Sequence, residues 1–587
     1  MIPELDRKVA VSVFLKYDAR HIPAHVVRIA FGSYKCHMRR SLLLVFLVAT
    51  ITLRAQNPMA VPPLIEADTF QLDVQAHTHE FHPGVVTATM GVGVPYLGPT
   101  LLFHKGDTVR LRVNNQLNEV TNMHWHGLKV PGEMDGGPQR EIMPGESWDV
   151  KYNVENEAGT YWYHPHTHMQ TGTQATKGIA GFIIVKDDDE SALDLPRTYG
   201  VDDFPVVIQD RRWLPNGNFS IGPFGDSLLV NGTPHPYLEL PAQVVRLRLL
   251  NGSNARVYEL GFEDGRSFHV IAGDAGLLHA PVEKDRQRLS NGERVEVLLD
   301  LSGMEGDSLM LMSYGSELPS SVPGGYNPVW ESSILNGIDF PVLRLRVTAP
   351  TADPVATIPL ALGTAQPPQL SDVIKDRFKV LNGTGMVGMG MFMIDGLMYD
   401  MDVINDTMLL GSTEMWTIMN ASNMAHPMHL HGVSFWVLER NGVPPPPEEQ
   451  GAKDVVLIDS GEQVKLIMRF DHPTDGWPFM YHCHNLMHED NMMMLQFIVV
   501  DLNTGMPGSA EAKVELFPSP THAFITWQSP FAVRQIRVFD IQGRQVMLSG
   551  THGMERGVLD LSALPAGLYT LELLGDKERA VGRVVKE

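Results

Sequence analysis

Cysteine is nearly absent from this sequence of 587 residues, which contains only Cys36 and Cys483. Cys36 lies in an N-terminal segment that we do not expect in the mature protein, so the mature chain should have one thiol and no disulfide. A lone thiol in an exported protein is open to oxidation unless burial or a bound metal protects it. The retention of Cys483 therefore needs a chemical reason.

Positive charge is also scarce, with 46 Lys and Arg against 68 Asp and Glu and a formal net charge of -22. Such an acidic chain argues against a nucleic-acid partner and favours the attraction of cations. Hydrophobic residues make up 43% of the chain and charged residues only 19%. We therefore expect a folded protein, and the length is sufficient for about three or four domains.

The apolar run at 41–53 is well short of the roughly 20 residues that span a membrane. It belongs to "MRRSLLLVFLVATITLRA" (38–55), which has the arginine pair, apolar centre and small-residue end of a secretory signal. We therefore expect translation to start at Met38, residues 1–37 to be a dispensable leader, and 38–55 to be a signal peptide that is removed on export. An N-terminal membrane anchor is the alternative.

Extended helical periodicity is lacking too. Short alternating or β-branched apolar runs occur instead, and Gly, Pro, Asn and Asp interrupt them every ten residues or so; examples are "TVRLRV" (108–113), "GFIIV" (181–185), "VVRLRLL" (244–250), "RVEVLLDL" (294–301) and "KLIMRF" (465–470). This pattern is typical of β-sandwiches. Polar or proline-bearing stretches at 186–200, 347–369 and 501–512 predict boundaries, and hence domains at 58–190, 198–350, 368–502 and 512–587.

Histidine is arranged in a pattern that chance does not produce. Roughly one His-x-His triplet is expected in a chain with this histidine content, yet six positions begin one: His77, His124, His164, His166, His429 and His482. On a strand, residues i and i+2 project from the same side, so such a pair suits one metal or two adjacent metals. Four triplets fit this arrangement and supply eight imidazoles: His124, His126, His164, His166, His429, His431, His482 and His484.

The last triplet has Cys483 between its two histidines. On a strand the middle residue points to the opposite face, so Cys483 should serve a second metal site that shares the strand with the first. A thiolate, imidazoles and a weak thioether form the ligand set of a blue-copper electron-transfer site. His488 and His426 can complete this set, and spacing alone leaves Met492, Met493 and Met494 open as the thioether.

At these residues the chain resembles the multicopper oxidases, and most of all the bacterial copper-efflux (cuprous) oxidases and laccases. The resemblance runs from about 65 to 500 and includes "LGPTL", "HWHGLKVPGEMDGGPQ", "YWYHPHTH", "GIAGFIIV", "LRLLNGSNAR" and "GERVEVLLDL". It implies an all-β chain with three cupredoxin-like Greek-key β-sandwich domains. It also implies four copper ions, with a trinuclear cluster shared between the first and third domains.

Carried over residue by residue, the resemblance assigns ligands to each copper. The type 1 copper would take His426, Cys483, His488 and axial Met493, and the type 2 copper would take His124 and His431. The type 3 pair would take the six remaining histidines: His126, His164, His166, His429, His482 and His484.

The resemblance also nominates Asp135 and Glu489 as proton carriers, and the alternative for each is a solvated loop carboxylate. Four further histidines are expected to be non-ligands, or else weak surface copper sites: His77, His79, His82 and His168.

The expected activity is one-electron oxidation of a small reducing substrate at the type 1 copper, coupled to four-electron reduction of O2 to water. A methionine run suits a path for Cu(I), although methionines also fill cores: Met386, Met389, Met391, Met393, Met398 and Met401. Ser422 stands where cuprous oxidases carry an acidic residue, which keeps phenols and aromatic amines open as substrates. The competing functions are copper storage or buffering, a partner-binding cupredoxin scaffold, and a nitrite reductase-like enzyme.

The last 75 or so residues contain short strand-like runs separated by turn residues. This pattern predicts a separate small β-module. Four motifs resemble the C-terminal sorting domain of type IX secretion substrates: "FPSP", "FDIQGRQV", "LDLSALPAGLYTLEL" and "GRVVK". The implied partner is the type IX secretion machinery, which would bring the protein through the periplasm to the cell surface or the medium. A carbohydrate-binding or adhesive module is the alternative.

Overall fold

The computed structural model describes residues 56–329, 333–386, 389–501, 514–575 and 579–587. The expected leader and signal peptide, with Cys36, lie outside these residues, as do the side chains of Met386 and Met389. In the described ranges the chain is built mainly of strands, and none of its helices is long and apolar enough to cross a membrane.

Domain 1, the first β-sandwich, packs a four-stranded sheet (β4-β3-β6-β8) against a five-stranded one (β2-β5-β10-β9-β7). Alternation decides which side chains enter its core: in β6 (Thr108–Asn115), Val109, Leu111 and Val113 are buried, while the residues between them are exposed. The other strands are β2 (Leu64–Glu66), β3 (Thr69–His82), β4 (Val85–Val92), β5 (Thr100–His104), β7 (His124–His126), β8 (Ser147–Asn153), β9 (Gly159–His164) and β10 (Gly181–Lys186).

Domain 2 packs a six-stranded sheet (β1-β14-β22-β21-β16-β19) against a seven-stranded one (β13-β12-β11-β15-β20-β17-β18). Its central strand β15 (Val244–Asn251) is buried on both faces. The strands are β1 (Asn57–Pro58), β11 (Asp203–Arg211), β12 (Ser227–Val230), β13 (Thr233–Pro234), β14 (Pro236–Pro241), β16 (Tyr258–Phe262), β17 (Phe268–Gly273), β18 (Gly276–Lys284), β19 (Gln287–Leu289), β20 (Arg294–Asp300), β21 (Ser308–Tyr314) and β22 (Asp339–Thr348).

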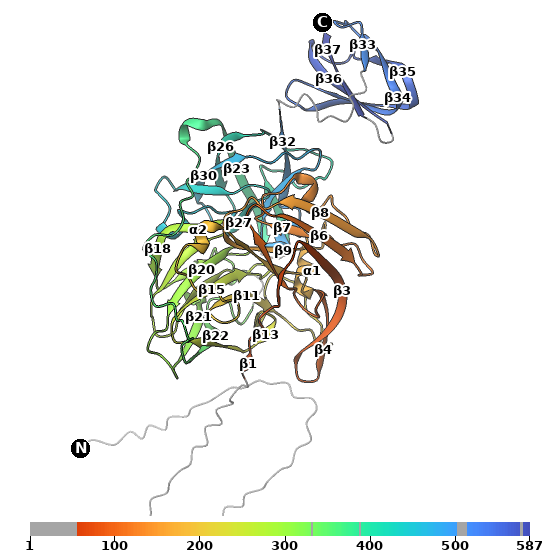
Figure 1. Cartoon of the computed structure of the whole chain (residues 1–587). Helices are drawn as coiled ribbons and strands as arrows, with labels where there is room; N and C mark the ends of the chain where they lie inside the picture. The colour runs from red at the N-terminus through yellow and green to blue at the C-terminus, as the bar shows by residue number, and fades with distance from the viewer. Residues whose placement is uncertain (1–55, 330–332, 387–388, 502–513, 576–578) are drawn as a thin grey trace, which may run out of the picture. The chain divides into compact units, whose positions relative to one another are not determined.

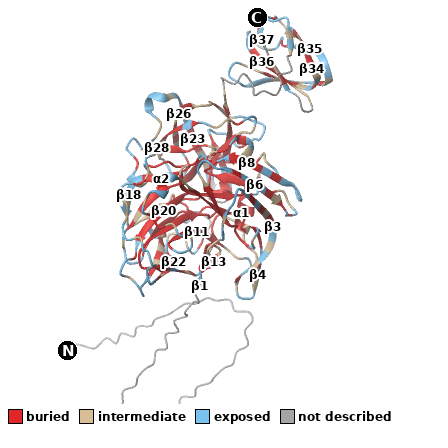
Figure 2. Cartoon of the chain, viewed as in Figure 1, coloured by how far each residue is buried: buried red, intermediate tan, exposed pale blue. Residues whose placement is uncertain are grey.

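Domain 3 has two five-stranded sheets, β24-β23-β26-β30-β28 and β25-β32-β31-β27-β29. Its strands are β23 (Val373–Met386), β24 (Met389–Ile394), β25 (Asp406–Leu409), β26 (Ser412–Asn420), β27 (His426–Leu430), β28 (Phe435–Arg440), β29 (Val455–Ile458), β30 (Gln463–Phe470), β31 (Phe479–Cys483) and β32 (Met494–Val500). Figure 2 shows buried residues along the strands of this three-domain body and exposed residues at its loops.

The C-terminal β-module has its own core around Trp527 and Ile536. It consists of β33 (Glu515–Phe517), β34 (Phe524–Phe539), β35 (Gln545–Asp560), β36 (Gly567–Leu574) and β37 (Arg579–Lys586), with β35 paired to β34 (Figure 1). The predicted all-β class, with three cupredoxin-like sandwiches and a C-terminal β-module, is confirmed.

Within the ranges that the structure describes, helical structure is limited to short connecting segments. These are α1 (Thr171–Lys177), α2 (Asp188–Ser191), α3 (Leu486–Asp490) and four 3-10 turns, η1 (Gly132–Met134), η2 (Gly315–Glu317), η3 (Leu370–Asp372) and η4 (Pro447–Glu449). Two of them, α2 and α3, each carry a buried glutamate, Glu190 and Glu489.

Candidate metal centre

Strand register brings the histidine triplets together. In domain 1, β7 pairs with β9 so that His124 lies opposite His164. In domain 3, β27 pairs with β31 so that His429 lies opposite His482, and Met428 opposite Cys483. The β7–β9 pair therefore places two triplets side by side in domain 1, and the β27–β31 pair does the same in domain 3.

The eight histidines of these triplets form one buried cluster between domains 1 and 3, and each is at most 1% exposed. The Nε2 atom of His482 lies 3.2 Å from Nε2 of His431 and 3.3 Å from Nε2 of His166. A tetrahedral metal bound to imidazoles at about 2.0–2.1 Å would separate the ligand nitrogens by about 3.3 Å. The spacing therefore fits metal ions held between the rings.

Hydrogen bonds fix the ring orientations. His124 and His429 donate from Nδ1 to the main-chain oxygens of Asp135 and Asp454, at 2.9 and 2.7 Å. Their Nε2 atoms are buried without a protein partner, as are both ring nitrogens of His484. Buried polar atoms without partners are rare in folded proteins, and neutral imidazole nitrogens of this kind are common metal ligands.

Burial in the cluster favours the neutral form of seven of its imidazoles. Burial, followed by the neighbouring histidines, lowers the pKa well below the usual value in most of the rings. For His164, His166 and His484, burial is again the main cause of the lowered pKa. The neutral form is the one that binds metal ions.

Asp135 connects two histidines from different domains. Its Oδ2 atom accepts a hydrogen bond of 2.8 Å from Nδ1 of His431, and its Oδ1 atom lies 3.6 Å from Nδ1 of His124. The two imidazole rings stack with centroids 3.8 Å apart. Asp135 is only 1% exposed, so the structure does not support the alternative of a solvated loop carboxylate.

Glu489 lies beside two other rings of the cluster, those of His166 and His482. It belongs to α3, and its carboxylate oxygens lie 3.5 Å from Nδ1 of His166 and 3.3 Å from Nδ1 of His482. Burial, reinforced by the charge of Asp490, raises the pKa of Glu489 well above its usual value. This carboxyl is therefore poised to hold a proton beside the cluster, and it too is not a solvated loop group.

A second candidate site lies on the opposite face of β31. The Cys483 sulfur is 3.4 Å from Nδ1 of His426 and 3.4 Å from Nδ1 of His488, and these two nitrogens are 3.2 Å apart. All three residues are fully buried. Burial raises the pKa of the Cys483 thiol and lowers the pKa of His426 to about 3, so both groups favour their neutral forms. The triangle is thus a desolvated set of soft and borderline ligand atoms.

Three methionines follow this triangle, and the structure separates them. Met493 is fully buried in the same hydrophobic cluster as Cys483, and its main-chain oxygen accepts a hydrogen bond of 3.1 Å from the Cys483 nitrogen. Met492 and Met494 instead pack with Tyr399 and Met480 in a different cluster.

Ser422 and Phe392 contact the two imidazoles of the triangle. The Ser422 hydroxyl lies 2.8 Å from Nε2 of His426, so an uncharged partner stands in this position. The Phe392 ring stacks on His488 with centroids 3.8 Å apart. Phe392 belongs to β24, the strand that also carries the exposed Met391.

Sequence reasoning missed two residues at the cluster, Asp454 and Arg294. The Asp454 carboxylate lies 3.1 Å from Nε2 of His126 and accepts hydrogen bonds of 2.7 and 2.6 Å from the Arg294 guanidinium. Burial raises the pKa of Asp454 to about 6 against the lowering effect of Arg294, which still leaves an ionised group at neutral pH. The available signal was the charged pair "KD" directly before the buried strand "VVLI".

The remaining histidines stand apart from both sites. His77, His79 and His82 lie half-buried on β3, and His168 makes a ring contact with Tyr399. Within the described ranges, every group of three or more close ligand side chains belongs to the two sites above. His77, His79, His82 and His168 belong to none of these groups.

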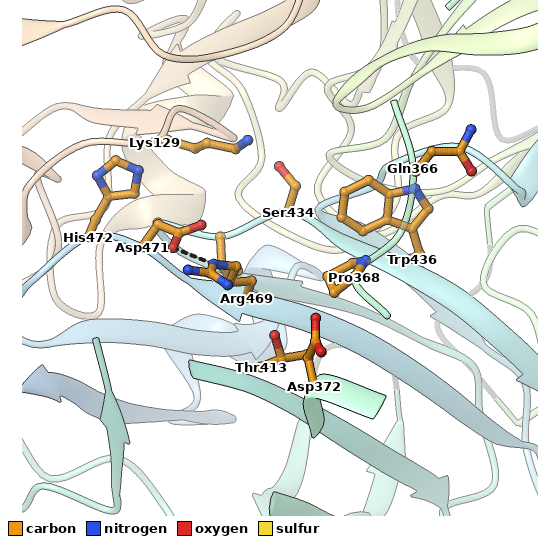
Figure 3. A pocket seen from close by; sticks show the side chains of 12 residues that line it. Lys129, Gln366, Pro368, Asp372, Thr413, Ser434, Trp436, Arg469, Asp471 and His472 are labelled. Carbon is orange, nitrogen blue, oxygen red and sulfur yellow. Dashed lines mark hydrogen bonds and ion pairs between the residues drawn. The ribbon is translucent and has the colours of Figure 1, made fainter. Parts of the chain in front are cut away.

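A cavity of about 260 Å³ opens beside the cluster without including any of its histidines. Lys129 and Ser434 reach it from the segments that follow "HWH" and "HLH", and Figure 3 shows their polar ends facing the same space. Arg469 and Asp471 form an ion pair of 2.8 Å at its edge.

Comparison with known proteins agrees with this geometry. A family model described as "Multicopper oxidase" matches residues 73–190, and a second with the same description matches 367–503. A model described as "Secretion system C-terminal sorting domain" matches 515–587. The cell division protein FtsP of Escherichia coli (strain K12) is 36% identical over 455 residues, which cover 76% of this chain and 93% of that protein.

Solved structures give the same result. The laccase-like multi-copper oxidase CueO from the lignin-degrading bacterium Ochrobactrum sp. is 36% identical with a TM-score of 0.68, covering 76% of this chain and 100% of that one. The McoA multicopper oxidase of the hyperthermophile Aquifex aeolicus is 30% identical with a TM-score of 0.68, covering 76% and 99%. With two family models, an extensive relative and the paired ligand clusters in agreement, the chain belongs to the multicopper oxidase family and ends in a secretion-system sorting domain.

Proposed function

We propose that this protein is an oxidase that takes single electrons from a small reducing substrate at the Cys483 site and delivers them to O2 at the eight-histidine cluster. The observation that carries the proposal is the pair of residues that flank Cys483. The Cys483 sulfur lies in the triangle with His426 and His488, whereas the adjacent His482 and His484 lie in the eight-histidine cluster. Electrons thus have a short covalent route between the two sites.

The ligand assignment follows the two clusters. His426, Cys483, His488 and axial Met493 would hold the type 1 copper, and the stacked pair His124 and His431 would hold the type 2 copper. The type 3 pair would be held by the other six cluster histidines: His126, His164, His166, His429, His482 and His484. Four copper ions per chain, when bound, would supply the one-electron redox couples.

Reduction of O2 to two waters consumes four electrons and four protons, and the chain places two buried carboxyl groups beside the cluster, Glu489 and Asp135. Burial disfavours the Glu489 anion and raises the pKa of this carboxyl well above its usual value, and its oxygens lie 3.5 Å from Nδ1 of His166 and 3.3 Å from Nδ1 of His482. Asp135 accepts the Nδ1 proton of His431 in a hydrogen bond and so holds that ring with Nε2 toward the cluster. We propose that Glu489 delivers protons and that Asp135 orients the type 2 pair.

Two substrate classes are supported by different observations. Met391, Met398 and Met401 are 59%, 44% and 38% exposed, so these three thioethers are not core fillers and remain open to Cu(I). Asp400 and Asp402 lie exposed in the same segment and add negative charge. We therefore propose Cu(I) first. Phenolic compounds are the second candidate, because the similar Ochrobactrum enzyme is described as having oxidase activity towards lignin model compounds and lignosulfonate.

The test of the oxidase function starts from copper-loaded protein. We expect a blue sample that consumes O2 when reductant is added, and a Cys483→Ser variant that is colourless and inactive but keeps copper in the histidine cluster. Met487→Leu, at a buried methionine outside the ligand set, is the matched control and should stay blue. Full copper loading without O2 uptake by the wild-type protein would exclude the oxidase function.

The similarity to FtsP supports a second candidate, a copper-independent scaffold that binds partners in cell division. This function predicts that Cys483→Ser complements a deletion of the gene as well as wild type does, whereas the oxidase function predicts failure of complementation under copper stress.

We also propose export through the type IX machinery, on the strength of the sorting-domain match at 515–587. Deletion of 512–587 should leave the protein in the periplasm, and the intact chain should reach the surface or medium.

A further inference from the structure

Domain 2 contributes none of the ligands assigned above, yet one of its turns touches the eight-histidine cluster. Gly292 adopts a φ of 79°, and a Cβ at this position would lie 3.0 Å from ring atoms of His484. Only a glycine allows this close approach in that backbone conformation. The turn leads directly into β20, whose first residue is Arg294.

Arg294 is fully buried, and all five of its N–H donors have partners. Three bonds go to main-chain oxygens: Nε to Thr160 at 3.0 Å, Nη1 to Gly292 at 2.9 Å and Nη2 to Asp274 at 2.7 Å. The other two reach the carboxylate oxygens of Asp454 at 2.7 and 2.6 Å. One guanidinium therefore joins domain 1 at Thr160, domain 2 at Gly292 and Asp274, and domain 3 at Asp454.

Asp454 in turn contacts two histidines of the cluster, His126 and His429. Its Oδ1 atom lies 3.1 Å from Nε2 of His126, and its main-chain oxygen accepts a hydrogen bond of 2.7 Å from Nδ1 of His429. The two rings come from domains 1 and 3 and stack with centroids 3.8 Å apart and planes 10° from parallel. His126 consequently turns Nδ1 toward the cluster, where it lies 3.3 Å from Nε2 of His164.

We propose that Arg294 is a positioning residue through which domain 2 sets the geometry of the type 3 histidines. It fixes the Asp454 carboxylate, and that carboxylate fixes His126 and the segment that holds His429. The proposal rests on the copper assignment made above. It gives domain 2 a part in the cluster although this domain supplies no ligand.

The shape of the guanidinium is essential to this role. Lysine keeps the charge but offers three donors on a point-like group, so it cannot serve three main-chain oxygens and both oxygens of Asp454. Gly127, the residue after His126, leaves the necessary room: a Cβ there would lie 2.2 Å from Oδ2 of Asp454 and 2.8 Å from Nη2 of Arg294.

The test compares Arg294→Lys with Arg246→Lys in the copper-loaded, full-length protein. Arg246 is the matched control because it is also buried at the domain 1–domain 2 boundary, and in the part of the chain that the structure describes its guanidinium bonds to Glu190 and Glu296 rather than to a cluster residue. The readouts are bound copper per chain, the blue type 1 band, and the EPR silence and near-ultraviolet absorption of a coupled type 3 pair.

We expect Arg294→Lys to keep the blue band and to lose type 3 copper or its coupling, with an affinity for that copper about 10- to 100-fold lower. Arg246→Lys should leave the type 3 signals unchanged. Intact type 3 signals in Arg294→Lys, or an equal loss in both variants, would overturn the proposal. Asp454→Asn should reproduce the Arg294→Lys effect, and the double variant should be no worse than either single one.

A measurement on copper-free protein tests the positioning role of Arg294 independently of the oxidase function. In crystals of copper-free protein, the stacked rings of His126 and His429 should stay in place in wild type and Arg246→Lys and should move apart in Arg294→Lys. Unmoved rings in Arg294→Lys would refute the positioning role even if the wild-type protein proved to bind no copper or consume no O2.

Discussion

The Asp135 carboxylate accepts a hydrogen bond of 2.8 Å from Nδ1 of His431, although the two residues are 296 positions apart in the chain. Its main-chain oxygen accepts a second bond from His124. One residue of domain 1 thus orients both histidines of the proposed type 2 copper, which come from different domains.

Asp135→Asn should therefore weaken type 2 copper binding. The amide keeps the shape of the side chain but loses the negative charge that the His431 N–H faces, and such partners of metal ligands are typically worth about 10- to 100-fold in affinity or activity. Copper analysis and the type 2 EPR signal measure the effect. Asp149→Asn, an exposed aspartate of the same domain, should change neither, and an unchanged type 2 signal in Asp135→Asn would contradict its orienting role.

Glu489→Gln should slow O2 reduction without slowing electron entry. Glutamine fills the same space between His166 and His482 but has no acidic proton, and proton transfer by a positioned group is worth about 10²- to 10⁴-fold. Stopped-flow absorbance should show type 1 reduction at the wild-type rate, followed by slow reoxidation in O2. Glu133→Gln, at an exposed position, serves as control, and wild-type reoxidation in Glu489→Gln would exclude it as the proton source.

The combined change of Met391, Met398 and Met401 to Leu should lower kcat/KM for Cu(I) by about tenfold or more, because soft thioether ligands are lost from the surface. The kcat/KM for a phenol should stay the same. Met143→Leu combined with Met554→Leu removes two exposed thioethers outside this segment and is the matched control. Equal effects on Cu(I) and phenol would refute a methionine path.

Glu296 should make folding sensitive to acid. Burial alone would raise its pKa, but the guanidinium groups of Arg246 and Arg248 outweigh burial and lower it to about 2. Because the pKa is depressed in the folded state, the stabilisation is complete above about pH 4.5 and is lost as the pH falls toward 2.

The linked free energy is on the order of 3 kcal/mol. Denaturant titrations at pH 6, 4 and 3 should show a smaller loss of unfolding free energy with acid in Glu296→Gln than in wild type. Identical pH dependence of the two proteins would show that Glu296 carries no such linkage.

Much of this architecture was predictable from local patterns. Alternation in "TVRLRV" predicts a half-buried strand, and the strand period predicts that Cys483 faces away from His482 and His484. The structure has Val109, Leu111 and Val113 buried in β6, and it places the Cys483 sulfur in a separate ligand triangle from its neighbours. Period and residue chemistry suffice for these features because they depend on neighbours in the chain.

Other parts depend on tertiary contacts that local patterns do not encode. Arg294 and Asp454 are 160 positions apart and meet only when domains 2 and 3 pack, so neither was predictable as a neighbour of the cluster. Spacing alone also left Met492, Met493 and Met494 equivalent. The family resemblance selected Met493, and packing puts it in the same cluster as Cys483. Ser422 was recognised as a departure, but its contact with His426 was visible only in the fold.

The central claim is that electrons accepted at the Cys483 site reduce O2 at the histidine cluster, and one measurement tests it most directly. Copper-loaded protein is reduced without oxygen until the blue band disappears and is then mixed with a known amount of O2. We predict return of the blue colour with one O2 consumed per four electrons and water as the product. Bleached protein that stays colourless in O2, or that releases hydrogen peroxide instead of water, would contradict the account.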